Sequence, residues 1–447
     1  MKWRRLAFII AAVTITSVAL FSFTWWMLPD PFGLVPLQIR LRLPEDVVTF
    51  LTTPIPTALP APLRAPADSQ TAVVLPDFPT STPTIIPTPR PLVNETLPPT
   101  FTPVAIATAK ATATATATPT SSPTATPTIP PIVRLEGMEV IAQQFNNCGP
   151  ANLTMVLNFH QQGLNQTEVG NSLKSSYDDR NVSPDEMVAY VQSATPLRAE
   201  YYSGGDIELL KHLLASGFPV IVERGFLPSE SLGWMGHYLT LFGYDDTDQT
   251  FLTMDSYQGP WDDSGRYESY ESMGELWEHF NNTFIVVFRP EDAQELSRIL
   301  GDNYASLNRM WLSSAVKAQE RTEQDPENAF AWFNLGTNLT VLGEITGEVD
   351  FYDNAALAYD RAREIGLPWR MLWYQFKPYR AYLEVGRIDE VLALTLSAQS
   401  VEETHLYRGH ALFEAGDIRG AESSYRRALQ LNPNFTMAEA ALASLTE

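Results

Sequence analysis

Apolar residues recur at two different spacings along the middle of the chain. Between residues 150 and 216 they return every three or four positions, which predicts three helices, at 150–160, 184–192 and 206–216. After residue 217, runs rich in β-branched and aromatic residues predict four strands, at 218–223, 238–243, 250–254 and 283–288. Helices followed by strands with short connections indicate an α+β domain with an antiparallel sheet, which we expect over residues 133–292.

From residue 303 to 447 the pattern is helical throughout, and small residues mark a repeat. Gly409, Gly416, Ala421, Ala428 and Pro433 are separated by 7, 5, 7 and 5 positions. These are the small-residue offsets of the 34-residue helix–turn–helix unit known as the tetratricopeptide repeat, or TPR. The sequence therefore predicts an all-α solenoid in this region, of the kind that binds a protein partner.

Two further units fit the same pattern less closely. One contains Trp332, Gly336, Gly343, Ala355 and Ala362 if about seven residues near 346–350 are inserted between its two helices. The other passes through Gly386 and Ala398. Several aromatic residues also recur at helical spacing, which is compatible either with a partner-binding face or with packing between helices. They are Trp332, Trp369, Trp373, Tyr374 and Tyr382.

The first 28 residues have the pattern of a membrane anchor. Three basic residues precede an uncharged stretch of 23 residues, Leu6 to Leu28, which would span about 34 Å as a helix. Because basic flanks stay in the cytoplasm, we expect a single-pass anchor with the α+β domain and the repeat domain extracytoplasmic. The alternative is a cleaved secretory signal, although no A-x-A-like cleavage site is evident. Either interpretation exports the remainder of the chain.

Residues 29–132 differ in composition from the rest of the chain. Between 51 and 132 they hold more than half of the 34 prolines, together with an alternating Ala-Thr run. Such a segment has little apolar surface to bury, so we expect a disordered Pro/Thr/Ala-rich linker. In an extended polyproline conformation, about 80 residues reach on the order of 250 Å at most. The domains that follow could therefore lie well away from the membrane.

Charge and cysteine content exclude several classes of function. The net charge is −22, from 30 basic and 52 acidic residues, which disfavours nucleic acid as a partner. Residues 133–447 hold 22 of the basic and 46 of the acidic residues, so the acidity belongs to the expected domains. One cysteine cannot form an intramolecular disulfide or a multi-thiolate zinc site. No metal-binding or phosphate-binding motif is present, and we expect no cofactor.

That single cysteine, Cys148, stands immediately before the first predicted helix. A thiol at this place meets the exposed amides and the positive end of the helix dipole, which favour the nucleophilic thiolate. A lone cysteine is also often an inert buried residue. The segment that contains it, QQFNNCGPA, begins with Gln143 and Gln144, and either side-chain amide could complete an oxyanion hole with the Cys148 N–H.

His237 and Asp255 supply the other parts of a thiol-based catalytic site. They lie at the start and end of two successive predicted strands, with a turn sequence around residue 246 between them. In a regular hairpin the two residues would face each other with their Cβ atoms about 4.5–5.5 Å apart, so that Asp255 could orient the imidazole. A register shift of one residue would place them on opposite faces instead.

Several segments resemble the bacterial peptidases related to the bacteriocin-processing, double-glycine leader peptidases, which have a papain-like fold. They are QQFNNCGPANLTMVL, VSPDEMVAY, GFPVIVE, GWMGHYLTLFGY and DSYQGP, all between residues 138 and 290. The resemblance implies that Cys148 is the nucleophile, His237 the base, Asp255 the orienting acid and Gln143 the oxyanion donor, with Gln144 as the alternative donor.

The resemblance implies a cysteine peptidase with a peptide or protein substrate. Leader peptidases are fused to an exporter and act in the cytoplasm, whereas this chain has no Walker motif and an expected outward orientation. The double-glycine substrate is therefore not carried over. Two alternatives remain at the level of sequence. One is a non-catalytic envelope scaffold that uses both domains for binding, and the other is a transferase that passes the acyl group to an amine.

Overall fold

The computed structural model describes residues 58–63, 129–177, 179–229 and 232–445. Residues 58–63 and every element described below belong to one compact unit of the chain. The segment expected to cross the membrane lies outside the described residues. Among the residues that are described, no helix has the length and apolar character needed to cross a membrane.

Within the described residues, the strands form one seven-stranded antiparallel sheet, which confirms the predicted sheet type. The order along it is β2-β7-β3-β4-β5-β6, and β1 pairs with β4 outside this path. The strands are β1 (Ile132–Arg134), β2 (Arg198–Tyr202), β3 (Val220–Phe226), β4 (Met235–Asp245), β5 (Thr250–Met254), β6 (Arg266–Ser269) and β7 (Phe284–Phe288). The four strands predicted from sequence are β3, β4, β5 and β7.

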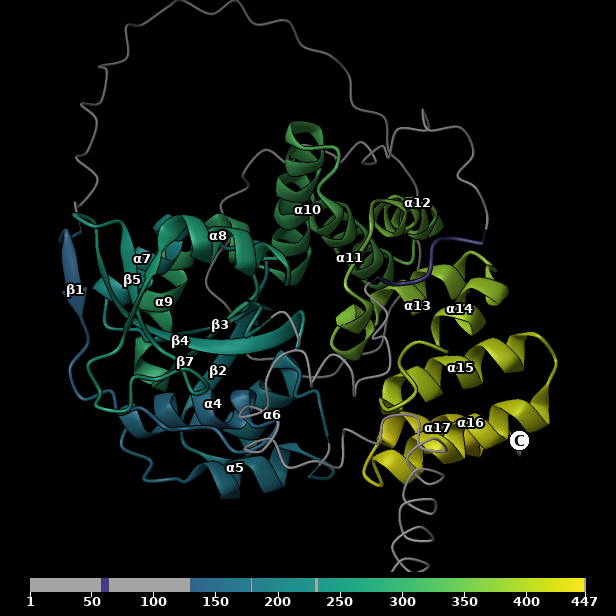
Figure 1. The fold of residues 1–447 in the computed structure, drawn as a ribbon, viewed down its shortest axis with the longest axis horizontal. Helices are drawn as coiled ribbons and strands as arrows, with labels where there is room; N and C mark the ends of the chain where they lie inside the picture. Colours follow the sequence, from purple (N-terminus) through teal and green to yellow (C-terminus); the bar gives the residue numbers. More distant parts are fainter. Residues whose placement is uncertain (1–57, 64–128, 178, 230–231, 446–447) are drawn as a thin grey trace, which may run out of the picture. The chain divides into compact units, whose positions relative to one another are not determined.

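Helices cover both faces of this sheet (Figure 1). On one face lie α4 (Cys148–Phe159), α5 (Gln166–Leu173) and α6 (Pro184–Ala194). On the other lie α7 (Ile207–Ala215) and α8 (Tyr270–Glu278), followed along the chain by α9 (Ala293–Leu300). The three predicted helices correspond to α4, α6 and α7. Asp206 caps α7 by accepting a hydrogen bond from the Leu209 N–H at 2.9 Å, as expected for an N-cap aspartate.

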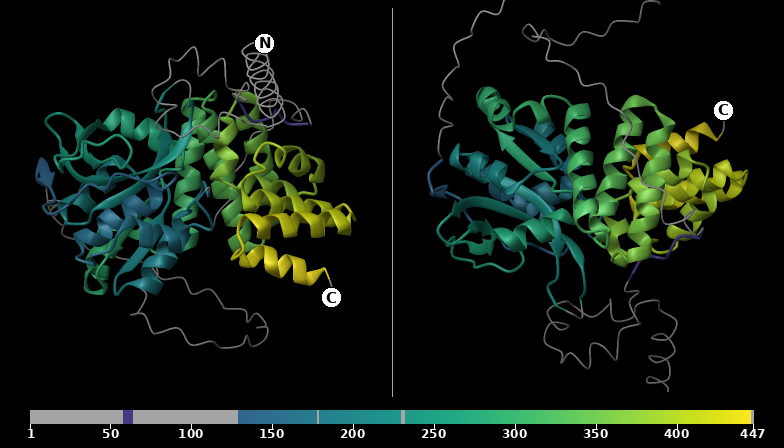
Figure 2. Two further views of the ribbon diagram at one scale, coloured as in Figure 1. Left: turned by 60° about the horizontal axis from the view of Figure 1, so that its bottom comes forward. Right: turned by 90° about the horizontal axis from the view of Figure 1, so that it is seen from above.

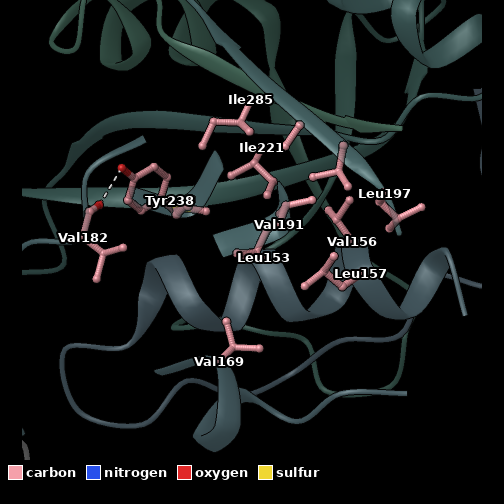
Figure 3. Close-up of a cluster of buried hydrophobic side chains, with 13 residues drawn as sticks. Leu153, Val156, Leu157, Val169, Val182, Val191, Leu197, Ile221, Tyr238 and Ile285 are labelled. Atoms are coloured by element: carbon pink, nitrogen blue, oxygen red, sulfur yellow. Dashed lines mark hydrogen bonds between the residues drawn. The ribbon is translucent and has the colours of Figure 1, made fainter. Parts of the chain in front are cut away.

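The core between the sheet and the first three helices consists of branched aliphatic side chains (Figure 3). Leu153, Val156 and Leu157 of α4 meet Ile221 of β3 and Ile285 of β7 there. Burial of each such side chain is worth about 1.5–3 kcal/mol relative to exposure. The core therefore fixes α4, and with it the position of Cys148, against the centre of the sheet.

The C-terminal region is helical throughout its described part, as predicted (Figure 2). Its α-helices are α10 (Leu307–Gln324), α11 (Ala329–Thr346), α12 (Val349–Ile365), α13 (Lys377–Glu384), α14 (Ile388–Leu394), α15 (Glu402–Glu414), α16 (Ile418–Leu431) and α17 (Thr436–Ser444). A 3-10 helix, η4 (Trp369–Trp373), connects α12 to α13. Three of the small residues singled out in the last repeat, Gly409, Ala421 and Ala428, are buried between helices. A Cβ atom on Gly409 would approach the Tyr425 ring to 2.2 Å.

The insertion expected between the helices of the first repeat is not a loop. Helix α11 continues to Thr346, and α12 begins at Val349, so the additional residues lengthen the helices to 18 and 17 residues. Between them Gly347 has φ 75°, a left-handed conformation that glycine adopts without steric cost. The seven additional residues are therefore present, but most of them extend the two helices because the sequence there continues the helical pattern.

A short piece of the expected linker departs from the expectation of disorder. Residues 58–63 lie against the helices α12 to α14, and the side chain of Leu59 is only 5% exposed. The expectation failed here because Leu59 buries apolar surface, although the composition of the whole segment is poor in apolar side chains. The remainder of the expected linker up to residue 128 lies outside the described residues.

Candidate active site

Cys148 is the first residue of α4, two positions earlier than the predicted start of that helix. Its N-cap residue, Asn147, makes no side-chain capping bond, and its amide donates to Gln166 Oε1 at 2.9 Å instead. The first amides of the helix are therefore left for the thiol, and the Gly149 amide lowers the pKa of Cys148. This is the arrangement in which a helix N-terminus stabilises a thiolate.

His237 lies on β4 between Cys148 and Asp255. Its Nε2 is 3.2 Å from Asp255 Oδ1, and the imidazole lines a small cavity together with Cys148. The imidazole is only 3% exposed, and it stacks on Phe226 with the ring centroids 4.6 Å apart. The structure thus brings together the three residues that the sequence proposed as nucleophile, base and orienting acid.

The route by which His237 and Asp255 meet differs from the expected hairpin. The expected register places Met254 opposite Tyr238, whereas Met254 pairs with Thr240, and a bulge follows between Leu241 and Gly243. The predicted register was therefore wrong. Because the displacement is an even number of residues, it leaves both side chains on the same face of the sheet. They meet as diagonal neighbours beyond the end of β5, which long side chains can span.

Asp255 is held by the turn that follows β5. Its Oδ1 accepts hydrogen bonds from the backbone N–H groups of Tyr257 at 2.8 Å and Gln258 at 2.9 Å. Burial alone would raise the pKa of this carboxyl, but the hydrogen bond and positive charge of His237, together with the two amides, lower it below its usual value. Asp255 is therefore a stable anion beside the imidazole.

The same contacts favour a thiolate–imidazolium pair. Burial would raise the pKa of Cys148, but the hydrogen bond and charge of His237 and the nearby backbone groups lower it. Burial would likewise lower the pKa of His237, but its hydrogen bonds to Asp255 and Cys148 and their negative charges raise it to about 9. A thiol whose pKa falls while that of its partner imidazole rises is poised for nucleophilic attack.

The two glutamines upstream of the thiol have different environments. Gln144 is exposed, and its Nε2 donates to Thr167 Oγ1 on α5 at 3.0 Å. Gln143 accepts a hydrogen bond from Ser256 Oγ at 2.8 Å through its Oε1, and its backbone N–H donates to the Ser256 carbonyl at 2.8 Å. The side chain of Gln143 is thereby tied to the turn that carries Asp255, whereas that of Gln144 is tied to α5.

A buried asparagine that the sequence did not single out connects these parts. Asn152, one turn after Cys148, is 0% exposed. Its Nδ2 donates to the carbonyls of Cys148 and Tyr238, both at 2.9 Å, and lies 3.1 Å from Ser256 Oγ. Its Oδ1 accepts from Thr240 Oγ1 at 2.7 Å. Asn152 thus joins α4, β4 and the turn after β5 through a fully buried polar network.

Two of the four predicted site residues, Cys148 and His237, also line a small cavity of about 20 Å³. Glu223 of β3 lies in its wall, and burial together with the negative charge of the Cys148 thiolate raises the pKa of Glu223 well above its usual value. The neutral carboxylic acid is therefore favoured next to the sulfur. Sequence reasoning missed Glu223 because a charged residue in a strand ordinarily faces solvent.

Comparisons with known proteins match two segments of this chain. Residues 128–285 match the model of the Peptidase_C39 like family, and residues 402–435 match the tetratricopeptide repeat. The first segment is a peptidase C39-like domain. The Peptidase_C39 like match confirms the resemblance proposed from the sequence. The TPR match coincides with the last of the predicted repeats. None of the curated proteins matches the chain.

Two solved structures are similar to the C39-like domain. One is a C39-like peptidase candidate from Bacillus anthracis, with 16% identity and a TM-score of 0.30, covering 35% of this chain and 98% of that chain. The other is a double-glycine motif protease from an AMS/PCAT transporter in complex with the leader peptide. It has 18% identity and a TM-score of 0.26, and the match again covers 35% of this chain and 98% of that chain.

The helical region also contributes to the site of the C39-like domain. Tyr374, directly after η4, lines the small cavity with Cys148 and His237. A Cβ atom placed on Gly236 would lie 3.2 Å from the Tyr374 ring and 2.7 Å from the Phe280 ring, so a side chain at that position of β4 would crowd both rings. Arg370 donates to the Trp234 carbonyl at 3.0 Å and so holds η4 against the start of β4. Tyr374 was noted in the sequence only as one of several aromatic residues.

A larger cavity of about 360 Å³ adjoins Gln143. It is lined by the turn after β5 and by the segment between β3 and β4, and Trp261 stands at it with 54% of its surface exposed. Its volume lies within the range of ligand-binding clefts, which is about 300–1,000 Å³. Among the described residues, no group of three or more His, Cys, Asp or Glu side chains could hold a metal ion.

Proposed function

We propose that this chain is a membrane-anchored, extracytoplasmic cysteine peptidase that uses Cys148, His237 and Asp255. The observation that supports this most strongly is the position of one imidazole, which lines a cavity with Cys148 and lies 3.2 Å from Asp255 Oδ1. Each of these residues alone has an ordinary structural explanation. Together they place a thiol at a helix N-terminus next to an imidazole, which in turn contacts a carboxylate. This arrangement activates a cysteine for acyl transfer.

The chemistry follows from the protonation states that the contacts favour. The Cys148 thiolate attacks the carbonyl carbon of a peptide bond, and the imidazolium of His237 gives its proton to the departing amine, leaving a thioester. The neutral imidazole then takes a proton from water, which attacks the thioester and releases the acid. Asp255 remains ionised throughout and stabilises the imidazolium in both steps.

Gln143 is the better candidate for the side-chain oxyanion donor. Since its Oε1 accepts from Ser256, the amide carries its Nε2 donor on the opposite side, and the Asn152 network fixes Ser256. The Cys148 backbone N–H would be the second donor. One such donor is worth about 2.7–4 kcal/mol of transition-state stabilisation in proteases. The contact between Gln144 and Thr167 makes Gln144 the weaker alternative.

The test is the pH dependence of Cys148 alkylation by iodoacetamide in the full chain, beside His237→Ala. Cys148 is the single cysteine of the protein, so the reaction reports on it alone. We expect half-maximal reactivity well below the free-thiol value of about 8.5, and a return toward that value in His237→Ala. His212→Ala, on α7, is the matched control and should leave the profile unchanged.

An alkylation profile that follows an ordinary thiol and is the same in His237→Ala would contradict the catalytic proposal. The rival function is then a binding scaffold, and one observation favours it. The cavity beside the thiol, about 20 Å³, has room for roughly one water molecule. A transferase would share the thioester and differ only in using an amine as acceptor, so finding an amide product with added amines would identify it.

The anchor and the outward orientation rest on the sequence of residues 1–28. Extraction of membranes with alkaline carbonate should leave the chain in the pellet if Leu6 to Leu28 is a retained anchor. An external protease added to intact cells should then degrade the C39-like domain. The TPR match supports a protein partner for the helical region, and the peptidase match supports a peptide substrate.

A further inference from the structure

Residues 58–63, Ala-Leu-Pro-Ala-Pro-Leu, form an extended strip on α12 to α14 (purple in Figures 1 and 2). At one end the Leu59 N–H donates to the Leu367 carbonyl at 2.8 Å, and the Leu59 side chain is buried. At the other end the Leu63 N–H donates to Glu390 Oε1 at 2.6 Å. The strip is separated from these partners by about 300 positions in the sequence.

Arg363 of α12 holds the middle of the strip. Its Nε donates to the Pro60 carbonyl at 2.9 Å, and a terminal nitrogen donates to the Ala61 carbonyl at 3.0 Å. Its other terminal nitrogen donates to Glu390 Oε2 at 2.9 Å and to the Tyr382 hydroxyl at 3.1 Å. One buried guanidinium therefore binds two successive carbonyls of the strip while it is fixed from behind.

The charges behind the strip balance one another. Arg387 pairs with Asp360 at 2.6 Å and with Glu390 at 3.0 Å, and Arg363 pairs with Glu390. Two arginines and two carboxylates leave no net charge in the cluster. A neutral cluster does not favour a charged ligand. The groups that face the strip are hydrogen-bond donors for carbonyls and one acceptor for an N–H.

The pattern of these donors and acceptors fits proline. The backbone N–H groups that find acceptors belong to Leu59 and Leu63, whereas Pro60 and Pro62 between them have no N–H to satisfy. An extended polyproline strip exposes its carbonyls and loses little conformational freedom when it is bound. The surface thus recognises the backbone of a segment of the form Leu-Pro-x-Pro-Leu, together with the side chain of its first leucine.

We propose that the surface formed by Arg363, Leu367 and Glu390 is a binding site for extended proline-containing segments of other chains, and that residues 58–63 occupy it in cis. The linker then connects the domains to the N-terminal segment and also competes with partner segments for this site. The attached strip acts at an effective concentration on the order of millimolar. A partner segment must therefore compete with residues 58–63 and displace them before it can bind.

The experiment uses the full chain and a fluorescent peptide that spans residues 56–66. In the Leu59→Asp chain the cis strip cannot bury its leucine, so the site should be open. We expect the peptide to bind this variant about tenfold or more tightly than the wild-type chain, as measured by fluorescence anisotropy. A peptide of equal length from residues 111–121 serves as the control and should bind neither chain.

Changes in the peptide test the contacts without altering the protein. Methylation of the Leu63 nitrogen removes the donor to Glu390, and Leu59→Asp in the peptide removes the buried side chain. Each should weaken binding to the open chain by about tenfold, as expected for a lost hydrogen bond to a charged group or a lost apolar contact. In the protein, Arg363→Lys keeps the charge but loses the fork that binds two carbonyls, and it should weaken binding similarly.

Equal binding of the peptide to the wild-type and Leu59→Asp chains would overturn the proposal, because the peptide would then occupy some other surface. No saturation of the open chain by about 1 mM peptide would also overturn it, since the strip would then be held only as part of its own chain. Circular dichroism and thermal melting of Arg363→Lys separate a lost contact from a lost fold.

Discussion

At the scale of single residues, the environment of Cys148 combines opposing effects on one thiol. Burial disfavours the charged thiolate, while His237 and the first amides of α4 favour it and prevail. His237 is governed by the same balance with the signs reversed. Glu223 is the exception, because burial and the thiolate act on it in the same direction. A carboxyl group beside the sulfur therefore stays neutral and does not repel the thiolate.

Asp255→Asn should narrow the pH range in which the thiolate–imidazolium pair exists. Asp255 helps to raise the pKa of His237 to about 9, so the group is protonated below that pH and loses its proton above it. Without the negative charge the pKa of His237 should fall by about one unit or more. NMR titration of the His237 ring would measure this shift directly, and the pH for half-maximal alkylation of Cys148 should rise in parallel.

Asp248→Asn is the matched control for this prediction. It removes the same charge from the exposed turn between β4 and β5, where solvent and salt screen its effect on His237. The two substitutions should therefore differ clearly in the pKa of His237. If Asp255→Asn left that pKa near 9, the hydrogen bond at 3.2 Å would have no part in stabilising the imidazolium.

At the scale of elements, the strands that are buried inside the sheet were predicted from the sequence, and the strands at its edges were missed. The strands found from sequence, β3, β4, β5 and β7, lie inside the sheet, where both neighbours and both faces demand apolar or β-branched residues. The strands that were missed are β2 and β6 at its two ends and the three-residue β1. Arg198 and Arg266 open these edge strands, and polar residues are common where one side faces solvent.

The site shows the same limit at the level of chemistry. Cys148, His237 and Asp255 were predictable because each stands at the end of an element with a recognisable local pattern. Asn152 and Tyr374 were not, since each acts on residues more than 80 positions away. The register of β4 on β5 was mispredicted because the turn is not centred on residue 246. Asp245 pairs with Thr250, three positions away from the expected register, and the bulge near Phe242 then removes one of the three.

The small residues of the last repeat permit a test of helix packing. Gly409→Ala adds a Cβ atom that would lie 2.2 Å from the Tyr425 ring, so α15 and α16 must separate. We expect a loss of about 1–3 kcal/mol in the free energy of unfolding, as for other overpacked positions. Denaturant titration followed by circular dichroism would measure it.

Gly274→Ala provides the opposite control. Gly274 lies within α8 and has open space around its Cα, with nothing within 4 Å of an added Cβ. Since alanine favours helix more than glycine does, this change should stabilise by up to about 1 kcal/mol. Equal stability of Gly409→Ala and the wild-type chain would show that the contact with Tyr425 does not fix the two helices.

At the scale of the whole molecule, the C39-like domain and the helical region share an interface of aromatic contacts and hydrogen bonds. Asn281 and Asn338 join the two parts at 2.6 Å, and Asn334 donates to the Glu278 carbonyl at 2.6 Å. Gln375 donates to the His279 carbonyl at 3.0 Å close to Tyr374. The helical region is therefore part of the site, because its Tyr374 supplies one wall of the cavity at Cys148.

Tyr374 should consequently control which groups reach the thiol. Tyr374→Ala removes the ring that closes the cavity of about 20 Å³, so the rate of alkylation by a bulky maleimide should rise by roughly tenfold relative to iodoacetamide, about 1.4 kcal/mol. Tyr374→Phe keeps the ring and should leave the ratio unchanged. Tyr267→Ala, on the exposed edge strand β6, controls for the loss of an aromatic residue elsewhere.

The ratio of the two rates makes this prediction independent of catalysis. A general change in thiolate content would alter the reaction with both reagents equally, because each reacts with the same anion. A change in access alone alters the bulky reagent selectively. An unchanged ratio in Tyr374→Ala would mean that the helical region does not restrict the site. A raised ratio would mean that binding of a partner near η4 could open or close the approach to Cys148, since Arg370 and Tyr374 hold that short helix against β4.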